Sequence, residues 1–158
     1  MSNEVFREFM NMLSDLVSFK SISINKEECE KTADYLRDIL KETGFSVNIV
    51  RPKEGNPVVL ASLEGIEKNS ILFYNHYDVQ PADPTNEWKT KPFKLKVIGD
   101  KIYGRGVGDN KGNIVARALA IKKVLEEDGE LPITVKFVIE GEEEIGSIHL
   151  PEFVKRYE

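Results

Sequence analysis

Three groups of side chains that can bind metals or transfer protons lie along this chain. The first is His76 with Asp78, in the segment "NHYDVQP". The second is Asp109, in the glycine-rich segment "YGRGVGDNKG", and the third is the glutamate run of "FVIEGEEEIGS", which contains Glu143 and Glu144. Imidazole nitrogens and carboxylate oxygens are common ligands of zinc. These residue types are therefore candidates for metal-assisted chemistry.

His76 and Asp78 are two residues apart, so their side chains share a face of an extended chain. This arrangement lets one ring nitrogen bind a metal while the carboxylate holds the orientation of the ring. A buried histidine with satisfied hydrogen bonds is the alternative, and the pair alone leaves both interpretations open.

The glycine-rich segment precedes a predicted helix, and Asp109 lies where that helix starts. In the simplest interpretation Asp109 caps the helix and the glycines form a turn. A phosphate-binding loop is excluded, because the segment lacks the G-x-x-x-x-G-K-[ST] spacing and follows a predicted hairpin.

Crowded carboxylates repel one another, so the glutamate run needs an explanation. Neighbouring residues of a regular strand face opposite ways, so Glu143 and Glu144 can share a site only if the strand has already ended. Gly141 and Gly146 bracket them and permit irregular backbone. A solvated acidic loop is the alternative.

Alternating helices and strands are predicted to position these groups. The helices are expected over 5–17, from about Asn25 to Gly44 with Glu28 as a capping-box partner, over about 110–127 and over 149–157. The strands are expected over 45–50, 57–64, 70–78 and 133–140, with a hairpin over 93–104. Strands buried on both faces, 70–75 and 133–139, bracket a helix and indicate a layered α/β sheet. Ligands of such sheets bind beyond the carboxyl ends of the strands.

The composition narrows the class of protein. The 158 residues are 41% hydrophobic and 31% charged, as in a single soluble domain. The net charge of −5 argues against nucleic-acid binding, and no apolar stretch is long enough to cross a membrane. Charged residues among the first twenty exclude a signal peptide. The lone Cys29 suits a reducing compartment, so a cytoplasmic location is predicted.

Taken in order, the motifs "NHYDVQPAD", "IYGRGVGDNKG" and "EGEEEIGS" resemble the peptidase family of carnosinase, related dipeptidases, acetylornithine deacetylase and succinyl-diaminopimelate desuccinylase. The resemblance extends from about residue 10 over the rest of the chain and is greatest to the dipeptidase branch. It implies a zinc-exopeptidase-like catalytic domain, with a mixed, largely parallel sheet flanked by helices. Such domains normally carry an inserted lid and dimerisation domain.

The resemblance also implies roles for individual residues. His76 would bind one zinc ion, Asp109 would bridge two ions, and Glu144 would bind the second. Asp78 would orient His76, and Glu143 would be the general base. The Asp109–Asn110 peptide bond would be cis.

The implied activity is hydrolysis of the amide bond of dipeptides or N-acyl amino acids by a water activated by two zinc ions. Cobalt or manganese would also suit these ligands. The full-length protein would be a homodimer.

The sequence departs from the family at its end. Members carry a further acidic ligand and a final histidine ligand downstream, whereas His149, the other histidine here, is interpreted as a surface or helix-start residue. Residues 1–158 are therefore expected to be the N-terminal portion of a catalytic domain that lacks its lid and C-terminal part. The isolated chain is expected to be inactive. A non-catalytic binding module that retains the motifs is the alternative.

Overall fold

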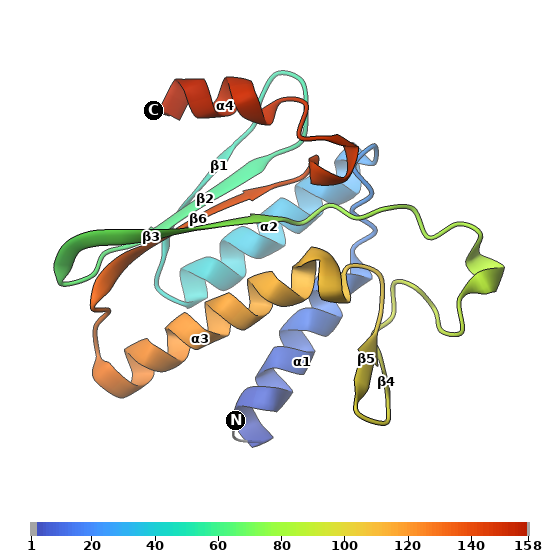
Figure 1. Cartoon of the computed structure of the whole chain (residues 1–158), viewed down its shortest axis with the longest axis horizontal. Helices are drawn as coiled ribbons and strands as arrows, with labels where there is room; N and C mark the ends of the chain where they lie inside the picture. Colours follow the sequence, from blue (N-terminus) through green and yellow to red (C-terminus); the bar gives the residue numbers. More distant parts are fainter. Residues whose placement is uncertain (1–2, 158) are drawn as a thin grey trace.

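A computed structural model describes residues 3–157 of the chain (Figure 1). The helices are α1 (Asn3–Ser18), α2 (Lys26–Glu42), α3 (Gly112–Asp128) and α4 (Leu150–Tyr157). The strands are β1 (Ser46–Val50), β2 (Val58–Leu63), β3 (Glu67–His76), β4 (Lys96–Ile98), β5 (Lys101–Tyr103) and β6 (Ile133–Glu140). Every helix and strand predicted from the sequence is present.

The start of α2 depends on its capping residue. The Asn25 side chain accepts a hydrogen bond from the Glu28 backbone N–H at 3.3 Å, as predicted. The Glu28 carboxylate, however, accepts from the backbone N–H of Lys20 at 2.9 Å, so the reciprocal half of the expected capping box is replaced. This bond ties the linker between α1 and α2 to the first turn of α2.

The main sheet has the order β1–β2–β6–β3. Strands β3 and β6 are parallel, while both pairings of β2 are antiparallel, so only β2 runs against the other three strands. The predicted mixed sheet is confirmed. Helix α3 connects the two parallel strands, and their register sets His76 opposite Glu140. Both strands thus end at the same edge of the sheet, which brings their following segments together.

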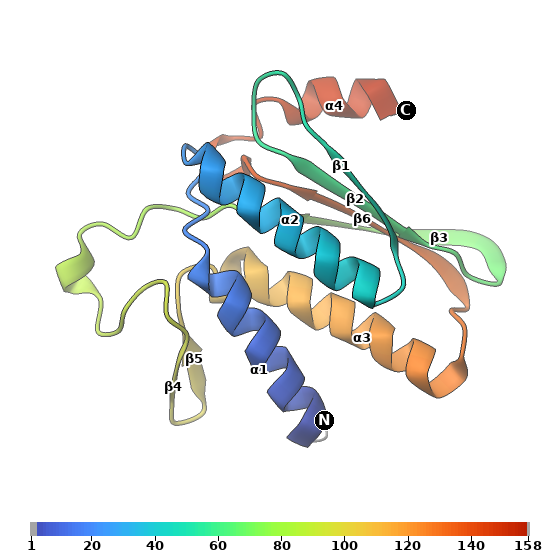
Figure 2. The same cartoon turned by 180° about the vertical axis from the view of Figure 1, so that it is seen from behind.

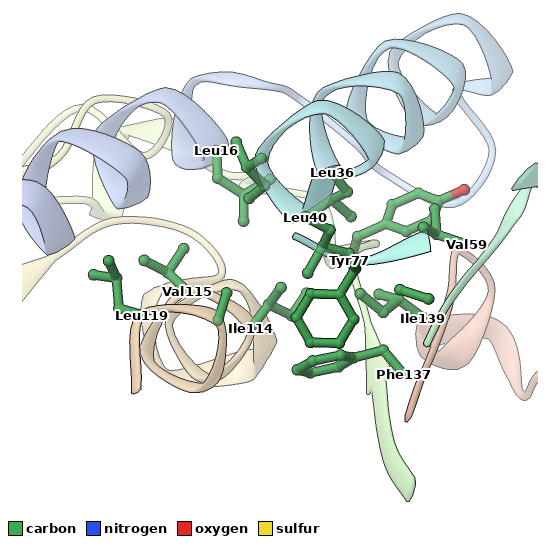
Figure 3. Packing of buried hydrophobic residues seen from close by; sticks show 14 of the residues in the cluster. Leu16, Leu36, Leu40, Val59, Tyr77, Ile114, Val115, Leu119, Phe137 and Ile139 are labelled. Atoms are coloured by element: carbon green, nitrogen blue, oxygen red, sulfur yellow. The ribbon is translucent and has the colours of Figure 1, made fainter. Parts of the chain in front are cut away.

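Helices α1, α2 and α3 cover one face of the sheet, and α4 lies on the opposite side (Figures 1 and 2). The core fills the space between the sheet and the three helices (Figure 3), and it includes Leu16, Leu36, Leu40, Val59, Tyr77, Ile114, Val115, Leu119, Phe137 and Ile139. Full burial of one such aliphatic side chain contributes about 1.5–3 kcal/mol. Within residues 3–157, no helix combines the length and apolar character needed to cross a bilayer.

The prediction that residues 70–75 are buried on both faces is wrong. Strand β3 is at the edge of the sheet, with Ile71, Leu72 and Tyr74 exposed by 39%, 59% and 45%. Leu72 lines an open apolar groove together with Leu60 and Phe153. The burial of a strand depends on the segments beside it, and among the described residues no strand pairs with the outer edge of β3.

An exposed strand edge that carries apolar side chains favours association between molecules. We therefore expect the 158-residue chain to self-associate as its concentration rises, and Leu72→Lys to shift it toward the monomer. Sedimentation velocity over a concentration series measures this. Ile98→Lys is the matched control, because Ile98 is also exposed but lies in the separate β4–β5 hairpin. A wild-type chain that stays monomeric throughout contradicts the prediction.

Candidate metal centre

His76 is the last residue of β3, and its imidazole is almost completely buried. Ring atom Nδ1 lies 3.3 Å from Asp78 Oδ1 and 3.2 Å from the Asp78 carbonyl oxygen. The other ring nitrogen, Nε2, lies 3.0 Å from Asp109 Oδ1. One nitrogen is thus occupied by Asp78, and the other faces a second carboxylate, as in a histidine that is oriented for metal binding.

Tyr77 lies between these two residues and is fully buried in the core (Figure 3). Its hydroxyl donates to the Pro57 carbonyl oxygen at 2.8 Å, and its backbone N–H donates to the Glu140 carbonyl oxygen at 2.8 Å. Because the Tyr77 side chain points into the core, the side chains of His76 and Asp78 are directed to the other side.

Asp78 has more partners than its predicted orienting role requires. Its Oδ2 accepts hydrogen bonds from Ser23 Oγ at 2.6 Å and from the Glu144 backbone N–H at 3.0 Å. Its Oδ1 accepts from the Glu143 backbone N–H at 3.2 Å. Burial alone raises the pKa of Asp78, but the bonds from His76, Ser23 and the Glu144 amide outweigh it and lower that pKa. Asp78 therefore stays ionised inside the protein.

Asp109 lies in an irregular turn, Val107–Lys111, that precedes α3. It does not cap that helix, so the capping interpretation is wrong; its carboxylate is directed to His76 and is 76% exposed. The Asp109–Asn110 peptide bond is cis, as the resemblance implies.

The turn that carries Asp109 is anchored by Lys111. The Lys111 ammonium is fully buried and donates to the carbonyl oxygens of Leu16 at 2.9 Å and Phe19 at 2.8 Å. Burial lowers the pKa of Lys111 to about 7. The loop with Asp109 is thereby tied to the end of α1.

Glu143 and Glu144 follow the end of β6, in a single 3₁₀ turn. Ligand atoms of His76, Glu143 and Glu144 all lie within 4.8 Å of one another. Gln80 Nε2 donates to a Glu144 carboxylate oxygen at 3.0 Å and also to its carbonyl oxygen. Strand β6 ends at Glu140, before Glu143 and Glu144, which is the condition that the sequence set for a shared site. The two glutamates therefore lie together.

The other two glutamates of the run point elsewhere. Glu140 accepts hydrogen bonds from the hydroxyls of Tyr74 and Ser147, and its burial raises its pKa. Glu142 is buried and pairs with His149, whose Nδ1 lies 2.8 Å from Glu142 Oε2. His149 directly precedes α4, as predicted, and its side chain is 30% exposed and engaged in this pair.

The charges around His76 suit a cation. Burial, the largest effect, lowers the pKa of His76, but hydrogen bonds to Asp78 and Asp109 and the nearby Glu143 outweigh it and raise that pKa to about 9. The imidazole thus attracts a proton to offset the carboxylates. A divalent ion offsets the same charge more fully, and one nitrogen with several carboxylate oxygens is a suitable donor set.

The structure therefore brings His76, Asp109, Glu143 and Glu144 to one edge of the sheet, with Asp78 behind the histidine. Their roles as ligands or general base stay predictions. Sequence reasoning missed Ser23 and Gln80, as well as Asn56, whose side chain donates to the carbonyl oxygens of Ser23 and Gly141. Ser23 and Asn56 belong to no local motif, whereas Gln80 lies within "NHYDVQP" and could have been considered from that position.

The sequence of the chain matches one protein family and is similar to known members of it. The sequence profile of peptidase family M20/M25/M40 matches residues 72–157. The Beta-Ala-His dipeptidase of Rattus norvegicus is 36% identical over 167 residues, which cover 94% of this chain and 34% of that protein.

Solved structures also match over nearly the whole chain, as two of them show. Human carnosine dipeptidase 1 has a TM-score of 0.86 and 34% identity over 95% of this chain and 35% of its own. The M20 family metallo-carboxypeptidase Sso-CP2 from Sulfolobus solfataricus has a TM-score of 0.86 and 40% identity over 99% of this chain and 34% of its own. The chain thus spans about a third of the length of these relatives.

The backbone of Gly141 packs closely against the side chain of Tyr77. A Cβ at Gly141 would lie 2.3 Å from the Tyr77 hydroxyl, and the buried ring has no room to move. We expect Gly141→Ala to lower the free energy of unfolding by about 1–3 kcal/mol, as measured by denaturant unfolding. Gly108→Ala is the matched control, since a Cβ there meets nothing within 4 Å. Equal stability of the two variants contradicts the packing account.

Proposed function

The chain belongs to peptidase family M20/M25/M40, and from this premise we propose that it contributes to a metal-dependent hydrolase of dipeptides or N-acyl amino acids. The observation that carries the proposal is the convergence of His76, Glu143 and Glu144, with ligand atoms within 4.8 Å of one another, next to Asp109. A family match alone would leave open whether this chain keeps a usable site. The geometry supports a site that can bind a metal.

We assign the ligands by their positions. His76 Nε2 and Asp109 would hold one ion, and Asp109 with Glu144 would hold a second. Zinc suits this combination of nitrogen and oxygen donors, and cobalt or manganese would also fit. Ions bound there supply Lewis acidity, which polarises a carbonyl oxygen and makes water nucleophilic near neutral pH.

Glu143 is the proposed general base. Its carboxylate is 42% exposed and lies 3.7 Å from His76 Nε2, so it borders the site without being enclosed by it. In this position it can take a proton from the attacking water and pass it to the leaving amine. Asp78 keeps the ring of His76 in place, and its bonds to the Glu143 and Glu144 amides hold the base and the ligand in register with the histidine.

The substrate class is inferred from the relatives. Two of them are named as dipeptidases and one as a metallo-carboxypeptidase, so each is named for action on peptides. Because the chain spans about a third of their length, the activity of a whole protein is part of the proposal. We also propose that residues 1–158 form one portion of a larger catalytic domain.

A second candidate function is a metal-binding module without catalysis. The observation that favours it is the small number of ligands: among the residues that the structure describes, each proposed ion has two protein ligands. Catalytic zinc sites usually have three. We therefore expect the 158-residue chain alone to bind zinc weakly and to hydrolyse dipeptides little.

Replacing the proposed ligand and the proposed base separates binding from catalysis. We expect the wild-type chain to bind zinc, and His76→Ala to weaken binding at least about tenfold because a ligand is lost. Glu143→Gln should leave zinc affinity near the wild-type value. In the longest protein that its gene encodes, Glu143→Gln should slow hydrolysis about 10²- to 10⁴-fold.

Calorimetric titration with zinc and assays on a panel of dipeptides and N-acyl amino acids measure these effects. Unchanged zinc affinity in His76→Ala would rule out the proposed site. Normal turnover by Glu143→Gln would remove its role as the base. If the longest protein that the gene encodes binds peptides only with zinc present and does not hydrolyse them, the non-catalytic module is favoured.

A further inference from the structure

Glu142 is adjacent to the proposed general base, yet its side chain points away from the metal site and is only 9% exposed. Its carboxylate has three donors. Oε1 accepts from the backbone N–H of Asn56 at 3.2 Å, and Oε2 accepts from the backbone N–H of His149 at 3.3 Å and pairs with His149 Nδ1 at 2.8 Å. The loop between β1 and β2 and the start of α4 therefore meet at this one carboxylate.

The backbone of Glu142 also organises the turn that carries Glu143 and Glu144. Its carbonyl oxygen accepts from the backbone N–H of Ile145 at 3.1 Å and of Ser147 at 2.8 Å. Asn56 adds a second link, because its side-chain amide donates to the carbonyl oxygen of Gly141 at 2.6 Å. The residues just before the Glu143–Glu144 turn are thus held by Asn56 and His149.

We propose that Asn56, Glu142 and His149 form a strut that positions the Glu143–Glu144 turn for metal binding and catalysis. Asp78 holds the Glu143 and Glu144 amides, and the strut holds the residue that precedes them. A turn that is bonded only through its own amides can rotate, whereas a turn that is also bonded through the preceding side chain keeps its carboxylates in place. Functional groups must be held within about 0.5 Å of the productive geometry.

The strut rests on the proposed function, since it concerns the same site. Glu142 and His149 are positioning residues, because they act through the backbone of the turn and do not face the site. The alternative is that the pair only stabilises the start of α4. The two roles differ in what they change at the metal site, so both the turn and the metal must be measured.

The first measurement is amide hydrogen exchange in the metal-free chain. We expect His149→Ala and Glu142→Gln to speed exchange of the Ile145 and Ser147 amides about tenfold, because a hydrogen bond to a charged group is lost. His149→Asn should stay near the wild-type rates, since its amide can donate from nearly the same place as Nδ1. Unchanged rates in both of the first two variants would overturn the strut.

Glu152→Gln is the matched control for the loss of a negative charge. Glu152 is exposed and lines the same cavity of about 310 Å³ as Glu142 and His149. It belongs to α4, and within residues 3–157 no hydrogen bond or ion pair joins its side chain to the turn. Its exchange rates at the turn should equal those of the wild type. Faster exchange in Glu152→Gln would assign the effect to general charge removal and overturn the proposal.

The second measurement is titration with cobalt, followed by its visible absorption spectrum. We expect His149→Ala and Glu142→Gln to alter the spectrum and weaken cobalt binding about tenfold, and His149→Asn to restore both. A faster-exchanging turn with an unchanged cobalt spectrum would overturn the positioning role. Absence of cobalt binding by the wild-type chain would contradict the proposed function itself, while the exchange rates would still decide whether the strut holds the turn.

Discussion

The rest of the site depends on the hydrogen bonds and the ion pair that the buried carboxylate of Asp78 makes. A buried charge is tolerated only where it is paired and hydrogen-bonded. Here the partners come from three separate parts of the chain: Ser23 from the α1–α2 linker, His76 from the end of β3, and the Glu143 and Glu144 amides after β6. Satisfying this one charge therefore fixes the relative positions of the segments that carry the proposed ligands.

A second constraint is the balance of charge around His76. Three carboxylates, those of Asp78, Asp109 and Glu143, lie within 4 Å of its ring nitrogens. The four glutamates that are crowded together in the sequence point to two different places in the structure. Glu140 and Glu142 are directed to donors of their own, and Glu143 and Glu144 remain at the site. The remaining surplus of negative charge is what a divalent cation would offset.

Much of the fold could be predicted because its signals are local. Helical spacing of apolar residues located α1, and the capping asparagine located the start of α2. The exposure of β3 could not be predicted, because an apolar strand has the same sequence whether it is central or at an edge. Its burial depends on which segments lie beside it.

The residues of the site likewise fall into those that local sequence signals identify and those that they do not. His76, Asp109 and the glutamates were found because their residue types and motifs are specific. The roles of Ser23 and Asn56 could not be found, since each contacts residues that lie far away in sequence. The Glu142 side chain is directed to Asn56, which is far away in sequence, and to His149, so its direction could not be found either.

The position of a bound zinc ion would decide whether His76, Asp109 and Glu144 form a metal site. Crystals of the chain grown with zinc would be measured at the zinc absorption edge, and the anomalous difference map would locate the ion. We expect a peak about 2.0–2.2 Å from His76 Nε2 and from a carboxylate oxygen of Asp109 or Glu144. A map with no peak at His76, or with its main peak between Glu142 and His149, would contradict it.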